Sequence, residues 1–269
     1  MPEGHTLHRL ATELSGTFGG QLVASSSPQG RFDEGAALVD GRVLLGAEAW
    51  GKHLLVGFES LAEQVHVHLG LYGSWVLGPE RPVVGQVRWR LSGAAGTADL
   101  RGPTACELLD PGAVETLLAR LGPDPLRRDA DPERAWQRLS ASRTPVAALL
   151  MDQRVLAGVG NVYRAELLFR HRVDPETPGR QLDREVWDAM WTDLVALMRT
   201  GERTGRIDTV RPEHEPEAMG REPRVDDHGG EVYVYRRTDL PCLVCGTPIR
   251  RRELAGRNLF WCPTCQQDG

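Results

Sequence analysis

The first residues of the chain, Met1-Pro2-Glu3-Gly4, combine a secondary amine with a carboxylate. Methionine before a small residue is commonly removed, and Pro2 would then carry the free α-amino group. An α-amino group titrates near ~8 and a lysine near ~10.4, so more of the terminal amine is neutral and able to attack at pH 7. Its condensation with an aldehyde carbon gives an iminium ion, the electron sink that elimination requires. Pro2 is therefore a candidate nucleophile and Glu3 a candidate proton carrier, unless proline follows Met1 by chance.

Four cysteines near the other end form two Cys-x-x-Cys pairs, Cys242/Cys245 and Cys262/Cys265, with 16 residues between the pairs. This spacing is typical of a tetrahedral structural Zn²⁺ site, and a ribbon of this size has too little core to fold without metal. Two disulfides are the alternative. No signal peptide or transmembrane run is visible, which favours a reducing cytoplasm and zinc. The fifth cysteine, Cys106, has no partner pattern and is interpreted as a small apolar core residue.

Lys52 is the single lysine among 32 basic residues. A coding preference for arginine would explain this bias without any functional meaning. Arginine does not release its proton in the accessible pH range, however, whereas lysine does. A site that needs proton transfer or a compact charge would retain lysine, so Lys52 is a candidate functional residue.

Basic residues are concentrated near the carboxyl end, although the formal net charge of the chain is −5. The segment 236–257 has a net charge of +4, from six arginines and two acidic residues. The overall charge argues against a general nucleic-acid binder, but this cationic segment indicates a local contact with a polyanion.

The elements that must position these residues fall into a strand-rich part and a helical part. Leu7, Leu10, Ala11 and Leu14 predict an amphipathic helix that ends near Gly16 or Gly19 and anchors the N-terminus. Short strand patterns then predict a β-sandwich or flattened barrel, at 42–47, 53–58, 64–69, 74–77, 87–91 and 98–100. A boundary follows at Gly122-Pro123-Asp124-Pro125.

Beyond this boundary, helical patterns occupy 132–140, 145–150, 163–170 and 184–200. Residues 201–230 are rich in Gly, Pro, Glu and Arg and predict a long mobile loop. A strand over 231–237 and a turn with a strand over 256–261 complete the predicted ribbon.

The densest motif of the helical part is Gly158-Val159-Gly160-Asn161, at the expected start of a helix. Such a glycine turn leaves N–H groups free at a helix N-terminus, which is a favourable place for an anion. Asn161 would either cap this helix or donate a hydrogen bond to a phosphate.

The whole chain resembles the formamidopyrimidine-DNA glycosylase and endonuclease VIII family. The resemblance rests on Pro2-Glu3-Gly4, Gly51-Lys52-His53-Leu54, His68 to Gly73, Arg120 to Asp124, Asp152 to Asn161, and the four-cysteine ribbon with Gly256-Arg257-Asn258. It implies an α+β, multidomain fold with damaged DNA held between domains. We expect an N-terminal β-sandwich with a helix at 1–122, a helix-two-turns-helix domain at 123–230 and a zinc ribbon at 231–269.

The resemblance also implies a role for each matching residue. Pro2 would form the Schiff base with C1′ of the damaged nucleotide, and Glu3 would help to open the sugar. Lys52 would donate a proton in β-elimination and contact a phosphate, and Arg257 would hold the phosphate at the lesion and assist δ-elimination. His68, Arg120 and Asn161 match DNA contacts of the family.

Rotating a nucleotide out of a duplex leaves a hole that Leu71 and Tyr72 would fill, as they match the wedge of endonuclease VIII. The alternative is that both are strand core. The formamidopyrimidine branch completes its wedge with arginine and phenylalanine from a later loop, where this chain offers Arg101 but no phenylalanine. This departure favours the endonuclease VIII branch and oxidised pyrimidines. His5-Thr6 replaces a family carboxylate, and Gly70 replaces a wedge glutamine that contacts the opposite strand.

We therefore predict a monomeric, bifunctional DNA glycosylase and AP lyase of base-excision repair that acts on double-stranded DNA containing oxidised bases or abasic sites. It would need one structural Zn²⁺ and no organic cofactor, and would work at the nucleoid in a bacterial cytoplasm. Two alternatives remain open: a non-catalytic damaged-DNA-binding protein, and an AP lyase with little base removal.

Overall fold

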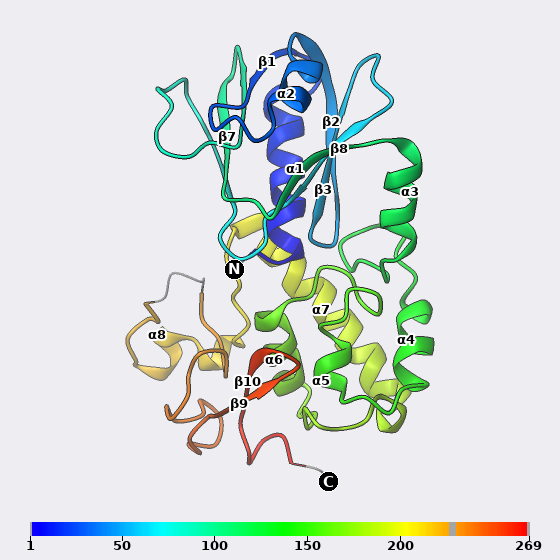
Figure 1. Ribbon diagram of the computed structural model, residues 1–269. Helices are drawn as coiled ribbons and strands as arrows, with labels where there is room; N and C mark the ends of the chain where they lie inside the picture. Colours follow the sequence, from blue (N-terminus) through cyan, green and yellow to red (C-terminus); the bar gives the residue numbers. More distant parts are fainter. Residues whose placement is uncertain (1, 226–229, 268–269) are drawn as a thin grey trace. The chain divides into compact units, whose positions relative to one another are not determined.

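A computed structural model describes residues 2–225 and 230–267 of the chain. The chain forms two compact units, Met1–Arg120 and Leu121–Gly269, which are drawn in Figure 1. No helix among the described residues has the length and apolar character needed to span a bilayer.

The first unit is built around helix α1 (Gly4–Phe18), which confirms the predicted N-terminal helix. Leu7, Leu10, Leu14 and Phe18 recur on one face of this helix and are buried. They form one core with side chains from strands on both sides of α1 in Figure 1. Burial of this face fixes the helix, and with it the position of the residues that precede it.

Eight antiparallel strands surround this core in the order β5-β7-β6-β1-β2-β3-β4-β8. Two four-stranded halves are joined where β1 and β2 share the two pairs Leu22↔Val43 and Val23↔Arg42. The strands are β1 (Leu22–Ser26), β2 (Arg42–Trp50), β3 (His53–Phe58), β4 (Gln64–His68), β5 (Ser74–Gly78), β6 (Trp89–Gly93), β7 (Gly96–Arg101) and β8 (Ala105–Leu109). All six predicted strands are present, with small differences at their ends.

Four elements of this unit lack a strong sequence signal. Helices α2 (Asp33–Val39) and α3 (Pro111–Ala119) are short, and α3 begins with Pro111 after Asp110, whose side chain accepts a hydrogen bond from the Ala113 N–H. Strand β1 is largely exposed outside Val23, and β8 is mostly half-buried, with Cys106 as its one buried residue. Without clear alternation, periodicity does not reveal such elements.

The second unit begins with helices α4 (Pro132–Ser140), α5 (Val146–Leu149), α6 (Asn161–Arg170) and α7 (Arg184–Thr204). These match the four predicted helices, and a short 3-10 helix, η1 (Gly179–Gln181), precedes α7. Helix α7 ends at Gly205, whose φ of 74° closes the helix in the left-handed region. Helix α6 is buried along almost its whole length, so it lies at the centre of this unit.

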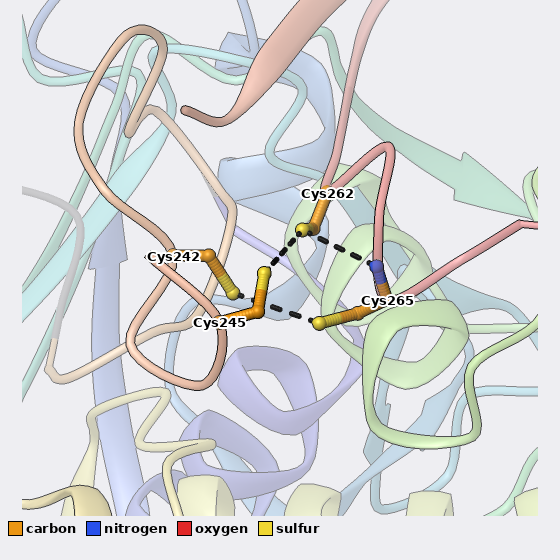
Figure 2. Close-up of side chains that lie close together, drawn as sticks. All are labelled: Cys242, Cys245, Cys262 and Cys265. Carbon is orange, nitrogen blue, oxygen red and sulfur yellow. Dashed lines mark hydrogen bonds between the residues drawn. The ribbon is translucent and has the colours of Figure 1, made fainter. Parts of the chain in front are cut away.

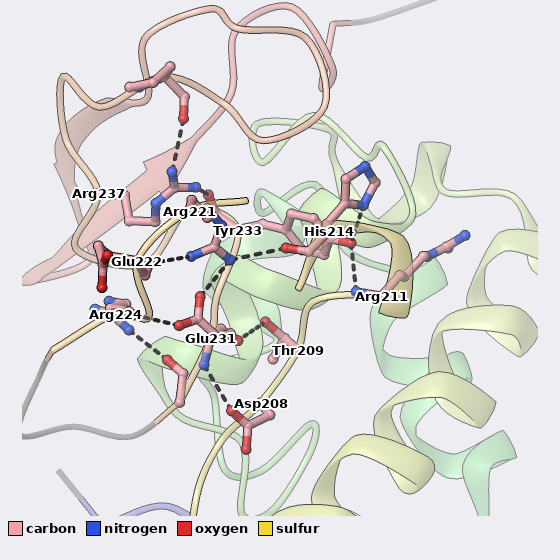
Figure 3. Close-up of polar contacts among 12 residues, drawn as sticks. Asp208, Thr209, Arg211, His214, Arg221, Glu222, Arg224, Glu231, Tyr233 and Arg237 are labelled. Carbon is pink, nitrogen blue, oxygen red and sulfur yellow. Dashed lines mark hydrogen bonds and ion pairs between the residues drawn. The ribbon is translucent and has the colours of Figure 1, made fainter. Parts of the chain in front are cut away.

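The segment 201–230, predicted as a long mobile loop, is not a loop throughout its described part. It contains the end of α7, the 3-10 helix η2 (Pro212–His214) and the short helix α8 (Pro216–Met219). Figure 3 shows the polar contacts that hold it: Arg221 pairs with Glu231 at 2.6 Å, and the Tyr233 hydroxyl accepts the Arg211 N–H at 2.8 Å. Residues 226–229 lie outside the described part.

The predicted strand over 231–237 is also wrong. The backbone N–H groups of Tyr233, Val234 and Tyr235 donate to the Glu166 carboxylate on α6, at 2.6 to 2.8 Å, instead of to a neighbouring strand. All three side chains are buried. The alternation of valine and tyrosine resembled a strand because both faces of this segment are apolar.

The ribbon contains one hairpin of β9 (Arg250–Leu254) and β10 (Arg257–Trp261), as predicted for its second strand. Ala255 and Gly256 form the turn with φ values of 50° and 70°. Ile249, Leu259 and Phe260 join the core that includes α6 and α7, so the ribbon is packed against the helices of its own unit.

Candidate active site and zinc ribbon

In the first unit, Pro2 and Glu3 lie directly before α1. Pro2 is half-buried, whereas Glu3 is fully buried and its carbonyl accepts the Thr6 N–H at 2.9 Å in the first turn of the helix. The N-terminal end of a helix favours negative charge, so this position suits a carboxylate. The structure thus buries the side chain of Glu3 at the start of α1, directly after the residue that would carry the free amine.

The next side chains along α1 are His5 and Thr6, where relatives were expected to carry a carboxylate. His5 is buried, and burial lowers the pKa of its imidazole to about 4. Its Nε2 lies 3.3 Å from the Thr6 hydroxyl. At neutral pH this position therefore contributes an uncharged ring.

Lys52 lies in the tight turn between β2 and β3, after Gly51 with φ 60°. The turn places Lys52 beside the first residue of β3, His53, which pairs across the strands with His68 at the end of β4. Burial, together with the nearby His66 and Lys52, lowers the pKa of His68. The structure therefore brings Lys52 and His68 to the same end of the sheet.

The predicted wedge residues form the loop after β4. Tyr72 is 89% exposed and Leu71 is 46% exposed, which contradicts the alternative that they are strand core. The loop is closed by the Gly73 N–H, which donates to the Leu69 carbonyl at 3.0 Å. Two large apolar side chains are thus presented to solvent on a loop that is itself hydrogen-bonded.

Gly70 has a left-handed backbone, with φ 66°, and a Cβ atom there would overlap the Thr104 side chain. Thr104 follows β7 and donates its N–H to the His68 carbonyl at 2.8 Å. The second loop therefore supports the first, and its threonine fills the space next to Gly70. This explains why glycine occupies a position where a wedge glutamine was expected.

Arg101, the one candidate from the second loop, is engaged within the first unit. Its guanidinium donates to Asp99 at 3.2 Å, and Arg90 makes a bidentate pair with the same carboxylate at 2.6 and 2.9 Å. Although burial alone would raise it, these hydrogen bonds hold the pKa of Asp99 below its usual range. Arg120 is exposed at the end of α3.

In the second unit, Asn161 is the first residue of α6 and is buried. It does not cap the helix, because Gly160 occupies the N-cap position. Instead its amide nitrogen donates to the Asn258 carbonyl at 2.9 Å, and its oxygen accepts a hydrogen bond from Arg164. The capping interpretation is therefore wrong.

The glycine turn before α6 is also partly occupied by the protein itself. Gln153 accepts the Gly158 N–H at 2.9 Å and donates to the Val159 carbonyl at 2.9 Å. The expectation of outward-pointing N–H groups therefore does not hold for Gly158.

Arg257 begins β10 and directly precedes Asn258, which is hydrogen-bonded to side chains of α6. The Asn258 carbonyl accepts hydrogen bonds from both Asn161 and Arg164, the latter at 3.0 Å. Arg257 itself is exposed. Because Asn258 is fixed in this way, the backbone of the exposed Arg257 is fixed as well. Arg164 contributes to this arrangement and was not predicted from the sequence, because a single buried arginine has no periodic signal.

The four cysteines of the ribbon converge, as Figure 2 shows. Their Sγ atoms all lie within 4.8 Å of one another, with 3.9 Å between Cys242 and Cys265 and 3.5 Å between Cys245 and Cys262. Backbone N–H groups of Val244 and Cys265 point at cysteine sulfurs, at 3.5 and 3.4 Å. Four thiolates at this spacing fit tetrahedral Zn²⁺ with Zn–S bonds of about 2.3 Å. The chain therefore has a structural zinc site, as predicted, and Cys106 lies in the core of the first unit.

Comparisons with known proteins match three parts of the chain to known domains. The formamidopyrimidine-DNA glycosylase N-terminal domain matches residues 1–106, its H2TH domain matches 121–211, and a zinc finger found in FPG and IleRS matches 239–267. Endonuclease 8 1 of Mycobacterium tuberculosis is 53% identical, over 99% of this chain and 100% of that protein. Probable endonuclease 8 2 of Streptomyces coelicolor is 34% identical, over 99% and 94%.

Solved structures agree in fold. MutM (Fpg) from Thermus thermophilus has a TM-score of 0.77 and 31% identity, covering 100% of both chains. The Lactococcus lactis formamidopyrimidine-DNA glycosylase bound to DNA with an AP site has a TM-score of 0.79 at 21% identity, over 99% of this chain and 100% of that one.

Proposed function

The chain belongs to the formamidopyrimidine-DNA glycosylase and endonuclease VIII family of base-excision repair glycosylases, and from this premise we propose a bifunctional DNA glycosylase and AP lyase. It would excise oxidised bases, with pyrimidines favoured, and cleave the strand by β,δ-elimination. We propose that residues 1–122 form the catalytic domain, that residues 123–230 form the DNA-binding domain, and that residues 231–269 form the zinc ribbon.

The proposed reaction starts at Pro2. Its neutral amine attacks C1′ of the damaged nucleotide, the base leaves, and opening of the sugar yields an iminium ion. Glu3 moves the proton that sugar opening requires. Its full burial at the start of α1 supports this role, because a carboxylate that is shielded from water and held by the fold has a fixed position.

Elimination then uses the iminium as its electron sink. A water molecule takes a proton from C2′, the electron pair of that C–H bond flows toward the iminium, and the C3′–O bond breaks so that the 3′ phosphate departs. Lys52 donates a proton in this step, and a second elimination at the 5′ side is assisted by Arg257. Exposure of Arg257 beside the fixed Asn258 carbonyl supports a phosphate contact there.

His68, Arg120 and Asn161 are proposed DNA contacts, and Leu71 and Tyr72 the wedge beside Gly70. The amide nitrogen of Asn161 already donates to Asn258, so its contribution to DNA binding would run mainly through the position of Arg257. Leu71 and Tyr72 are exposed and can replace base stacking, worth roughly 1–3 kcal/mol per base. The single-loop wedge supports the endonuclease VIII branch and its preference for oxidised pyrimidines.

The observation that carries this proposal is the placement of Pro2 and the buried Glu3 directly before α1, because the apolar face of this helix is fixed in the core. Duplex DNA with oxidised bases or abasic sites is the proposed partner. We also propose a monomer in a bacterial cytoplasm, active at the nucleoid.

Borohydride reduction during incubation with DNA tests the nucleophile. We expect the wild-type protein to form a covalent adduct with DNA that contains thymine glycol and with DNA that contains an abasic site. Pro2→Gly should form the adduct more slowly, because its primary amine gives an imine that is cationic only when protonated, whereas Pro28→Gly, a matched change in an exposed loop, should match the wild-type protein.

An adduct that Pro2→Gly forms as fast as the wild-type protein would refute the assignment of the nucleophile. An adduct with abasic DNA alone would support the alternative of an AP lyase with little base removal. Binding of damaged DNA without any adduct would support the non-catalytic alternative.

A further inference from the structure

Three polar side chains form a row on the outer face of the sheet in the first unit. The antiparallel register pairs His53 with His68, and His66 with Glu107. Cross-strand partners point to the same face of a sheet, so His53, His66 and Glu107 project together. Their strand neighbours Leu54, Val67 and Cys106 project to the opposite face and lie in the core.

The row is one continuous hydrogen-bonded chain. His53 Nδ1 lies 2.9 Å from His66 Nε2, and His66 Nδ1 lies 3.1 Å from Glu107 Oε1. An ionised carboxylate only accepts, so His66 must donate from Nδ1, which leaves His66 Nε2 as an acceptor when the ring is neutral. His53 must then donate from Nδ1, and its own Nε2 carries a lone pair.

The two ends of the chain differ in their surroundings. The Glu107 side chain is 54% exposed, whereas the His66 side chain between Glu107 and His53 is buried. His53 is next to Lys52, and the groups that act on its ring are His66 and His68 from β4, Arg120 after α3, and Lys52 itself. Burial and these neighbours lower the pKa of His53 to about 3, so its ring is neutral at pH 7.

We propose that Glu107 and His66 are positioning residues for Lys52, because they fix His53 in the tautomer whose Nε2 is a neutral hydrogen-bond acceptor for the Lys52 ammonium. This inference rests on the proposed role of Lys52 in strand cleavage. It adds Glu107 and His66, which lie outside the family motifs, to the residues that support Lys52.

A neutral acceptor has a specific advantage at this place. A carboxylate beside Lys52 would offset the positive charge that a DNA phosphate needs, and a protonated histidine would repel the ammonium. An imidazole lone pair orients the ammonium and leaves its charge available. Among the residues that the structure describes, only the four cysteines are grouped closely enough to hold a metal ion, so we interpret this row as an orienting device instead of a metal site.

Imidazole nitrogen spectra of the full-length protein test the tautomers directly. Long-range ¹H–¹⁵N correlations at pH 7 should show the Nδ1–H form for both His53 and His66. Glu107→Ala should shift His66 toward Nε2–H, and His53 with it, whereas Glu107→Gln should preserve both forms because its amide oxygen still accepts. Glu115→Ala, an exposed carboxylate on α3, is the matched control and should change neither ring.

Single-turnover cleavage of DNA with a preformed abasic site tests the consequence. Glu107→Ala should slow cleavage by about tenfold, the usual order for loss of an outer orienting group, with DNA affinity preserved. Glu107→Gln should restore the rate, a rescue that a role for the negative charge itself would not give.

The Nε2–H tautomer at His53 in the wild-type protein would overturn the proposal. So would equal loss of rate in Glu107→Gln and Glu107→Ala, or wild-type cleavage by Glu107→Ala. Failure of the wild-type protein to form a borohydride adduct would instead remove the proposed function, and the tautomer measurement would still report on the chain of hydrogen bonds.

Discussion

His53 is a basic side chain that the fold keeps uncharged. Burial is the main cause, and His66, His68, Arg120 and Lys52 add to it, so the pKa falls from 6.5 to about 3. Between these two values the unfolded chain binds a proton at this residue and the folded chain does not. The contribution of His53 to the free energy of unfolding is therefore fully present above pH 6.5 and is lost as the pH is lowered from 6.5 toward 3.

Replacing His53 with glutamine should reduce this pH dependence. We expect the stability of His53→Gln to decline less between pH 7 and pH 4 than that of the wild-type protein, when both are unfolded in urea. A part of the decline should remain, because burial also lowers the pKa of His5 to about 4. Parallel curves for the two proteins would show that His53 is not kept neutral by the fold.

Asn161 shows that the type of a residue does not determine its hydrogen-bond partner. The sequence offered two interpretations, a helix cap and a phosphate donor, because an amide at the start of a helix suits both. The actual partner of its amide nitrogen is the carbonyl of Asn258, which is 97 positions away in the chain. A backbone carbonyl exists at every residue, so its identity as a partner cannot be predicted from residue types.

At the scale of elements, helix α6 connects the parts of the second unit. Its first residue, Asn161, binds the hairpin at Asn258, and Glu166 within it binds the backbone of residues 233–235. Glu166 is fully buried and also accepts the Thr209 hydroxyl at 2.6 Å. One helix thus fixes both the hairpin and the segment that leads into it.

Replacing Glu166 with glutamine should destabilise the second unit. One carboxylate oxygen becomes an NH₂ group that cannot accept the N–H and hydroxyl donors now aimed at it. Hydrogen bonds to charged groups contribute about 1.5–3 kcal/mol each, and a buried donor left unpaired adds to the cost, so we expect a loss of about 2–4 kcal/mol. Urea unfolding measures it, with Glu185→Gln, at an exposed site on α7, as the control. Equal stability of the two variants would show that Glu166 does not hold the segment.

The same helix explains one incorrect prediction among the elements. Helices α4 and α7 follow from periodicity, because each has one apolar face, and α6 and the six main strands follow from short apolar runs between turn signals. The segment 231–237 carries equally apolar residues, but its backbone donors are satisfied by a side chain from α6. In such a case the hydrophobic pattern predicts that the segment is buried, but it does not predict which group accepts the hydrogen bonds of its backbone.

At the scale of the whole molecule, the proposed catalytic residues are divided between the two units. Pro2, Glu3 and Lys52 belong to the first, and Arg257 belongs to the second. Family motifs assign these residues to one reaction, although no local pattern in the sequence connects them. The supporting residues Thr104, Arg164 and Glu107 lie outside the motifs and could be identified only from contacts.

Removal of zinc should test how the ribbon contributes to the whole protein. Cys242 and Cys262 are buried and belong to the same core as α6 and α7, so the ribbon is part of the packing of the second unit. Structural zinc sites supply folding free energy, and loss of the metal should therefore free the hairpin that carries Arg257. We expect chelation to release one Zn²⁺ per chain, lower the melting temperature and reduce strand cleavage by more than about tenfold.

The first unit should stay folded in this experiment, because its core contains α1 and the eight strands but no metal ligand among the described residues. Borohydride trapping on abasic DNA can then report on Pro2 when DNA is supplied at saturating concentration. Cys245→Ala should behave like the chelated protein, whereas Cys106→Ala, which removes a buried thiol from the first unit, should retain zinc and cleavage. Full cleavage by metal-free protein would mean that the ribbon does not position Arg257 for the reaction.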